Sequence, residues 1–168
     1  MKTLARLMLV PALLAAAAGL VAAWGLVDFS ASNPPKWIEE KAARFVLNRS
    51  IERHAPGKSN PLAGSRAETA AGLALYRAHC VECHGAPGVD PTEEGASLNP
   101  PAPGLTLPLV QARSDGQLFW IVSHGIRMTG MPSFSPPRTE HEIWQLVAAL
   151  RRLPDLSDAE QRAMGGER

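Results

Sequence analysis

Two cysteines and a histidine stand at a spacing that can hold a haem group. The run is Cys80-Val81-Glu82-Cys83-His84, and it contains both of the cysteines among the 168 residues. Such a C-x-x-C-H run is typical of c-type haem attachment, because two thiols one helical turn apart can add to the two haem vinyl groups while the next residue places an imidazole beneath the iron. The sequence therefore predicts one covalent haem c, held by Cys80 and Cys83, with His84 as the proximal iron ligand.

The same cysteines have three other interpretations: a buried thiol pair, a redox dithiol, or half of a zinc site. A structural zinc site needs four ligands, and no second Cys/His pair is spaced to complete one. A zinc or dithiol module would also leave the later run Gly130-Met131-Pro132 without an explanation. We therefore favour haem attachment, which consumes both thiols and leaves none for a disulfide.

The second axial position of the iron has several candidate ligands. A methionine thioether raises the reduction potential and suits a carrier of electrons. Met131 has the best context, because Gly130 lets the backbone approach the macrocycle and Pro132 stiffens the chain after the ligand. We predict Met131 as the distal ligand; the other candidates are Met128, His124, His141, His54, His79 and Met164.

The charge distribution constrains the partners. The net charge is +1, which does not indicate nucleic-acid binding. From Ala55 onward ten Lys/Arg stand against twelve Asp/Glu, and Lys58 is the only lysine. Docking to redox proteins is therefore expected to use arginines or apolar surface rather than a ring of lysines.

The N-terminal segment predicts a membrane anchor. Leu7 to Val27 is a stretch of 21 uncharged residues that follows Lys2 and Arg6. As a helix it would be about 31 Å long, close to the hydrocarbon thickness of a bilayer. We expect residues 1–32 to hold a transmembrane helix; the alternative is a signal peptide cleaved after a small-residue site at Val21-Ala22-Ala23.

The orientation of such an anchor follows from its charges. Lys2 and Arg6 should stay in the cytoplasm, which sends the rest of the chain outward. Covalent haem attachment in bacteria also takes place outside the cytoplasmic membrane. The sequence thus predicts a single-pass protein of the bacterial cytoplasmic membrane with its haem domain on the periplasmic side.

Residues 33–64 are expected to form a juxtamembrane helix and a linker. Asn33-Pro34-Pro35 interrupts the first helix, and a second helical pattern begins near Lys36. Ile38, Ala42, Phe45 and Val46 share one face of that second helix at helical spacing. Contact with lipid, a solvated spacer and packing on the haem domain are all compatible with this pattern.

Residues 65–168 predict an all-α haem domain with a C-terminal tail. A long loop, Gly85 to Ala112, contains six prolines and no strong periodicity, and a large cofactor would give this loop something to wrap. Trp120 and Trp144 each have an indole N–H for a haem propionate or a partner helix, although ordinary packing explains them equally well. Three helices are expected, and each begins with a reciprocal capping box: Ser65 with Glu68, Ser114 with Gln117, and Thr139 with Glu142.

The order of these features resembles the class I monohaem cytochromes c, especially the cytochrome domains attached to haem-copper oxidases and dehydrogenases. The resemblance runs from Ser65 to Leu153 and includes the run Gly130-Met131-Pro132-Ser133-Phe134. It implies a cytochrome c fold of three main helices around a covalently bound haem, with His84 and Met131 as axial ligands. It also implies that a carbonyl in the proline-rich loop accepts a hydrogen bond from His84; Pro103 is the best match, and Pro101 is next.

The resemblance further implies close contact of Gly72 and Tyr76 with the terminal helix. Where many relatives have an aromatic residue in that helix, this chain has Val147-Ala148-Ala149-Leu150, so the contact is expected to use Trp144 instead.

The expected function is electron transfer by a single haem between membrane or periplasmic redox partners, such as an oxidase, a reductase or a dehydrogenase. The chain is expected to be a carrier, free or as a subunit of a complex, and not itself an enzyme. The alternative is a haem peroxidase or gas-binding sensor with a displaceable sixth ligand, for which Arg127 and His124 would be the polar distal groups.

Overall fold

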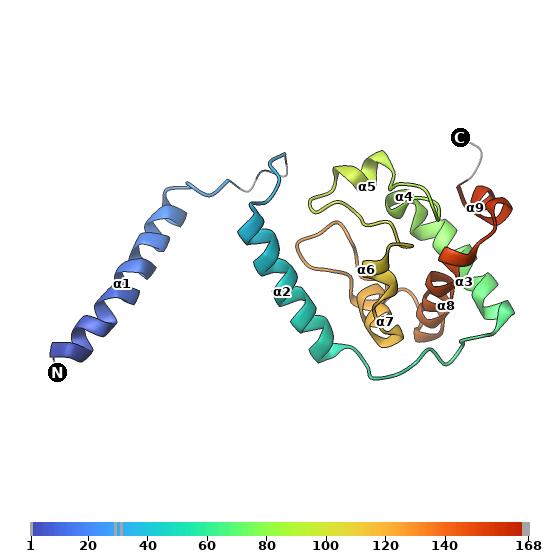
Figure 1. The fold of residues 1–168 in the computed structure, drawn as a ribbon, viewed down its shortest axis with the longest axis horizontal. Coiled ribbons are helices and arrows are strands. Elements are labelled where there is room, and N and C mark those ends of the chain that lie inside the picture. The colour runs from blue at the N-terminus through green and yellow to red at the C-terminus, as the bar shows by residue number, and fades with distance from the viewer. Residues whose placement is uncertain (1, 29, 31, 166–168) are drawn as a thin grey trace. The chain divides into compact units, whose positions relative to one another are not determined.

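The computed structural model describes residues 2–28, 30 and 32–165, with side chains from residue 9 onward. All of the regular structure within these residues is helical (Figure 1), as predicted for an all-α chain. In chain order the helices are α1 (Lys2–Ala23), α2 (Trp37–His54), α3 (Arg66–His79), α4 (Val81–His84), α5 (Glu93–Ser97), α6 (Pro108–Gln111), α7 (Asp115–His124), α8 (Glu140–Arg152), the 3-10 helix η1 (Leu153–Asp155) and α9 (Asp158–Gly165).

The chain divides into two compact units, Met1–Asn33 and Pro34–Arg168. The first unit contains α1, which ends at Ala23 rather than at Val27, and Gly25 follows with a φ of 65°. In the part of the chain whose side chains are described, no helix is long and apolar enough to cross a membrane. The transmembrane helix predicted over residues 7–27 is therefore not supported.

Two of the three predicted capping boxes are present. In α7 the Ser114 hydroxyl accepts a hydrogen bond from the Gln117 amide, and the Gln117 side chain accepts one from the Ser114 backbone. Thr139 and Glu142 form the same reciprocal pair at the start of α8. These boxes satisfy N–H groups that have no partner within their own helices, and so they fix where the helices begin.

In the third predicted capping box, only one of the two reciprocal hydrogen bonds forms. The Ser65 hydroxyl accepts a hydrogen bond from the Glu68 amide and begins α3 as predicted. The Glu68 carboxylate does not return to Ser65; it accepts a hydrogen bond from Gln145 Nε2 at 2.6 Å and lies 3.1 Å from His141 Nε2. A tertiary contact with α8 has replaced the local bond, so that Glu68 ties α3 to α8.

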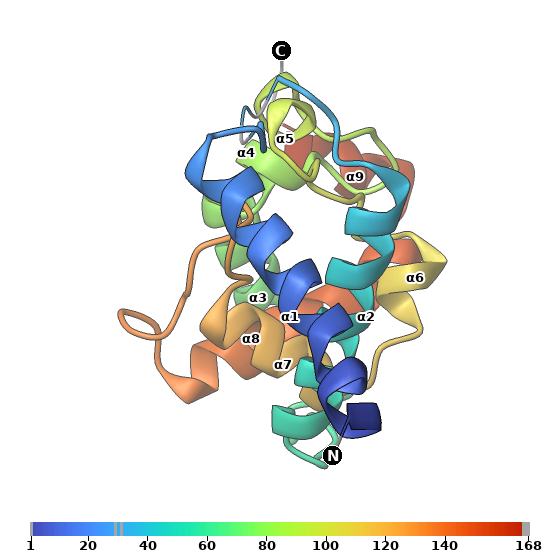
Figure 2. The same cartoon turned by 90° about the vertical axis from the view of Figure 1, so that its left-hand side faces the viewer.

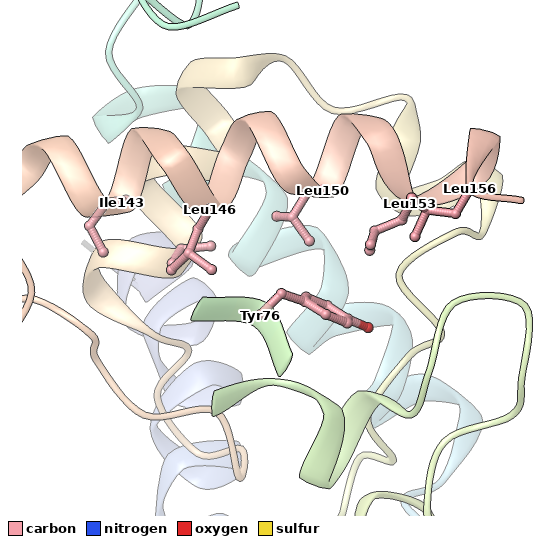
Figure 3. Close-up of a cluster of buried hydrophobic side chains, with 7 residues drawn as sticks. Tyr76, Ile143, Leu146, Leu150, Leu153 and Leu156 are labelled. Carbon is pink, nitrogen blue, oxygen red and sulfur yellow. The ribbon is translucent and has the colours of Figure 1, made fainter. Parts of the chain in front are cut away.

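The α3–α8 crossing is the centre of the second unit. A Cβ on Gly72 would lie 1.9 Å from the carbonyl oxygen of Gln145, so the two helix backbones touch there and only glycine fits. Tyr76 lies one turn further along α3, beneath the apolar face of α8 (Figure 3). The contacts predicted for Gly72 and Tyr76 with the terminal helix are confirmed. The buried cluster around Tyr76 includes three side chains of α8 and two from the residues after α8: Ile143, Leu146, Leu150, Leu153 and Leu156.

The contact predicted for Trp144 is wrong. Its ring stacks on Phe119 with the centroids 4.3 Å apart, and it packs in a second buried cluster with Val110, Leu118 and Val147. The α3 crossing uses Ala149 instead, whose Cβ lies 3.1 Å from the position of a Cβ on Gly72. A small side chain is required where two backbones approach so closely.

The long loop is not structureless. It contains α5 and α6, which have five and four residues. Such short helices leave no periodic pattern, but each has a local start signal. Thr92 caps α5 by accepting a hydrogen bond from the Gly95 amide at 3.1 Å, and Pro108 occupies the first turn of α6.

The second unit also contains α2, whose C-terminal end packs on α7 (Figure 2). Ile51 is fully buried there, and Asn48 accepts a hydrogen bond from Arg113 at 2.8 Å. The predicted apolar face of Ile38, Phe45 and Val46 is exposed. The sequence left three roles open for this helix: contact with lipid, a solvated spacer, or packing on the predicted haem domain. The C-terminal end of α2 has the last of these roles.

Candidate functional site

The C-x-x-C-H run forms a tight helical turn at the end of α3. Cys80 terminates α3, and its carbonyl oxygen accepts hydrogen bonds from the backbone N–H groups of Cys83 and His84, at 3.2 and 2.8 Å. Gly85 ends the turn with a φ of 74°, and a Cβ on it would lie 2.5 Å from the carbonyl oxygen of Asp90. The two thiols and the imidazole therefore all come from one stretch of five residues, with Cys80 at the junction of α3 and α4 and with Cys83 and His84 within α4.

A second short helix holds this turn from outside. A Cβ on Gly95 of α5 would lie 1.8 Å from the carbonyl oxygen of Cys83, so α5 touches the backbone of the turn. The Thr92 hydroxyl donates a short hydrogen bond to the carbonyl oxygen of Glu82. Neither contact was predictable from local sequence, because each joins residues that are separated by about ten positions of irregular chain.

Cys80 and Cys83 form no disulfide, and both are partly buried. Burial raises the pKa of the Cys80 thiol to about 12, and the neighbouring Cys83 raises it further in the same direction. Cys80 is therefore protonated at neutral pH in the chain before any attachment. Addition of a thiol to a vinyl group makes a thioether, which removes this titratable group.

The His84 imidazole is oriented by the proline-rich loop. Its Nδ1 lies 2.8 Å from the carbonyl oxygen of Pro103. A carbonyl oxygen only accepts, so Nδ1 carries the proton and Nε2 has its lone pair free for a metal ion. Burial lowers the pKa of His84, and the bond to Pro103 opposes that effect in part. The ring is thus neutral at physiological pH, which is the form that binds iron.

The Met131 segment is built on the C-terminal end of α7. The last carbonyls of a helix have no partner within it, and here the Ser123 carbonyl accepts hydrogen bonds from the Ser133 hydroxyl at 2.7 Å and the Ser135 amide at 3.0 Å. A Cβ on Gly125 would lie 2.6 Å from the carbonyl oxygen of Met131. Both features fix the course of the backbone that carries the thioether.

Met131 and Cys80 both contact the same buried apolar cluster. Each is partly buried and packs against the buried cluster that includes Tyr76 and Leu146. Leu105, which follows the Pro103 carbonyl by two residues, packs against the same cluster. Met128 is placed differently: it has a φ of 61° and its side chain is 84% exposed.

The other candidate ligands are engaged elsewhere. Trp120 lies between two of them, with His54 of α2 stacked on its ring at 6.1 Å and His124 at 5.1 Å. Trp120 thus packs against α2 through its ring. The roles predicted for its indole N–H, with a haem propionate or with a partner helix, stay predictions. The other three candidates have these contacts: His141 with Glu68, His79 with Arg138, and Met164 with the buried cluster.

Comparison with known families agrees with this geometry. Residues 67–148 match the model of the family described as "Cytochrome C oxidase, cbb3-type, subunit III". These residues form a c-type cytochrome domain. Such domains are monohaem and are associated with haem-copper oxidases, so the predicted resemblance is confirmed. No curated protein gives a match to the chain.

The residues of the cytochrome domain suit a covalently bound haem c. The two thiols lie on the turn that ends in His84, the His84 ring is held in the tautomer with a free Nε2, and a thioether packs on the same apolar cluster as Cys80. Neutral imidazole and thioether are both ligands that haem iron accepts in cytochromes. The family implies the cofactor, and the cysteine arrangement fits its attachment.

Proposed function

We propose that the cytochrome domain carries electrons through one covalently bound haem c, attached at Cys80 and Cys83. A bound haem c supplies a one-electron redox couple. His84 is assigned as the proximal ligand and Met131 as the distal ligand. The observation that carries this proposal is the hydrogen bond between His84 Nδ1 and the Pro103 carbonyl, which leaves Nε2 available beside the cysteine turn.

The residues around the site would keep both axial positions filled. Met131 is partly buried and its segment is tied to α7, which favours a ligand that stays in place. His124, one of the two polar residues expected above the iron in a peroxidase or sensor, is stacked on Trp120, and its Nδ1 lies 3.0 Å from the Trp120 carbonyl. These contacts favour a carrier over the peroxidase or sensor alternative.

The partner and compartment follow from the family and the cofactor. We propose that the domain exchanges electrons with a membrane oxidase, because the matching family is associated with haem-copper oxidases. We place it on the periplasmic side of the bacterial cytoplasmic membrane, where haem is attached to C-x-x-C-H runs. Fusion of alkaline phosphatase to the C-terminus tests this location, since that enzyme is active only outside the cytoplasm; an inactive fusion that is expressed at normal levels contradicts it.

The absorption spectrum tests the function. The reduced protein should show a low-spin c-type spectrum that carbon monoxide does not change. The oxidised protein should show the weak long-wavelength band of sulfur ligation, which Met131→Ala abolishes and Met128→Ala retains. The second variant is the matched control, because Met128 is exposed. Ready binding of carbon monoxide by the unmodified protein would contradict a filled sixth position and favour a sensor or peroxidase.

A further inference from the structure

The side chain of Gln111 joins two distant segments of backbone. This residue is the last of α6, and its Nε2 donates hydrogen bonds to the carbonyl oxygens of Leu105 at 2.7 Å and Leu150 at 3.1 Å. Both bonds are partly buried. A single amide group therefore connects the proline-rich loop to the last turn of α8.

The carbonyl of Leu150 needs a donor from outside its helix. In a continuing α-helix it would accept a hydrogen bond from the N–H of the residue four positions later. Residue 154 is Pro154, which has no N–H. Gln111 supplies the missing donor, so its position is set by the rigid end of α8.

The other carbonyl lies next to the loop segment that binds His84. Leu105 follows Pro103 by two residues. On the other side of Pro103, the Ala102 amide donates a hydrogen bond to the Gly95 carbonyl at 2.9 Å, and Gly95 touches the cysteine turn. The Pro103 carbonyl is thus held from both sides, by α5 before it and by Gln111 after it.

We propose that Gln111 is a positioning residue for the proximal iron ligand. By fixing the loop to the end of α8, it keeps the Pro103 carbonyl where it accepts the hydrogen bond of His84 Nδ1. A histidine that donates this bond is a stronger electron donor to its metal, which stabilises the oxidised iron. This inference rests on the proposed function, because it assumes that His84 binds the haem iron.

The experiment uses the haem-loaded full chain with Gln111→Met, which keeps the volume of the side chain and removes its donor. Gln161→Met is the matched control, because Gln161 Nε2 also donates to a leucine carbonyl, that of Leu156 at 2.9 Å, and its side chain lies in α9. Proton NMR gives the solvent exchange rate of the His84 Nδ1 proton, and a redox titration gives the reduction potential.

Gln111→Met should accelerate exchange of the Nδ1 proton about tenfold, the effect of weakening one hydrogen bond by about 1.4 kcal/mol. It should also raise the reduction potential, because a weaker hydrogen bond makes the imidazole a poorer donor. Gln161→Met should leave both quantities at their original values. Equal exchange rates and potentials in the two variants would overturn the proposal.

A second measurement applies if Gln111→Met does not fold. In the unmodified protein, the Nδ1 proton of His84 and the side-chain amide protons of Gln111 should exchange through the same opening, with the same dependence on urea. Different urea dependences would refute the link. A protein without any c-type spectrum refutes the proposed function itself; a normal spectrum with unlinked exchange refutes only the role of Gln111.

Discussion

Asp115 offers a sharp test of how the haem domain is held together. It is the first residue of α7, and its carboxylate accepts hydrogen bonds from the backbone N–H of Asn60 at 2.9 Å and from Arg151 Nε at 2.8 Å. The side chain is 22% exposed. One carboxylate therefore joins the chain before α3, the start of α7 and the end of α8.

The proposed change is Asp115→Asn, which keeps the shape and removes the charge. A hydrogen bond to a charged group contributes about 1.5–3 kcal/mol, and an asparagine can accept only one of the two bonds while its NH₂ faces a donor. The Arg151 side chain is one-third exposed, so water replaces part of what is lost. We expect a loss of about 2 kcal/mol in the free energy of unfolding at neutral pH.

The pH dependence of this loss has a definite sign. Burial raises the pKa of Asp115, but the bonds from Asn60 and Arg151 outweigh it, and the net pKa in the folded protein lies below the ordinary value. Such a group stabilises the folded state fully above its unfolded pKa, about 3.9, and loses that contribution as the pH falls through the lower folded value. The difference between the original protein and Asp115→Asn should therefore be constant near neutrality and shrink below about pH 4.

Urea unfolding followed by circular dichroism measures the difference across this pH range. Asp158→Asn is the matched control, because Asp158 is also the first residue of a helix, follows a serine, and is exposed. The control should cost no more than the contribution of a helix dipole, about 0.5 kcal/mol. An Asp115→Asn variant that costs no more than the control, or whose cost is unchanged in acid, refutes the reasoning.

Two further variants test the packing. Gly72→Ala should lower the free energy of unfolding by at least about 2 kcal/mol, because its Cβ would overlap the Gln145 carbonyl; urea unfolding measures this, and a neutral effect would mean that α3 and α8 separate easily. Ser123→Ala should raise the free energy of unfolding by about 1 kcal/mol, because the Ser123 hydroxyl is buried without a hydrogen-bond partner among the described residues. A loss of stability there would instead indicate that water in the adjoining cleft of about 260 Å³ binds the hydroxyl.

Features that depend on local sequence were predictable. The starts of α7 and α8 follow from side chains three residues apart, and such pairs act within one turn of helix. The cysteine turn likewise follows from five consecutive residues. The hydrogen-bond partner of His84 was not predictable from local sequence, because Pro103 lies 19 residues away. Only the family resemblance indicated it.

Features that depend on competition between partners were not predictable. Glu68 has two possible sets of donors, its own N-cap and the side chains of α8, and only the fold decides between them. Trp144 has the size to fill a helix crossing, but the approach of Gly72 to the α8 backbone leaves room there only for Ala149. The apolar run at the N-terminus likewise did not determine where α1 ends.

In the loop between α4 and α7, hydrogen bonds to the backbone help to hold the chain in place. The largest fully buried side chains all lie outside it, and the loop adds Val110 and Leu105 to the buried clusters. Its backbone is also held by directional bonds, from Thr92 to the cysteine turn and from Gln111 and Arg151 to its carbonyl groups. Directional bonds fix atoms more closely than apolar contacts do, and the atom that has to be fixed in this loop is the Pro103 carbonyl beside His84.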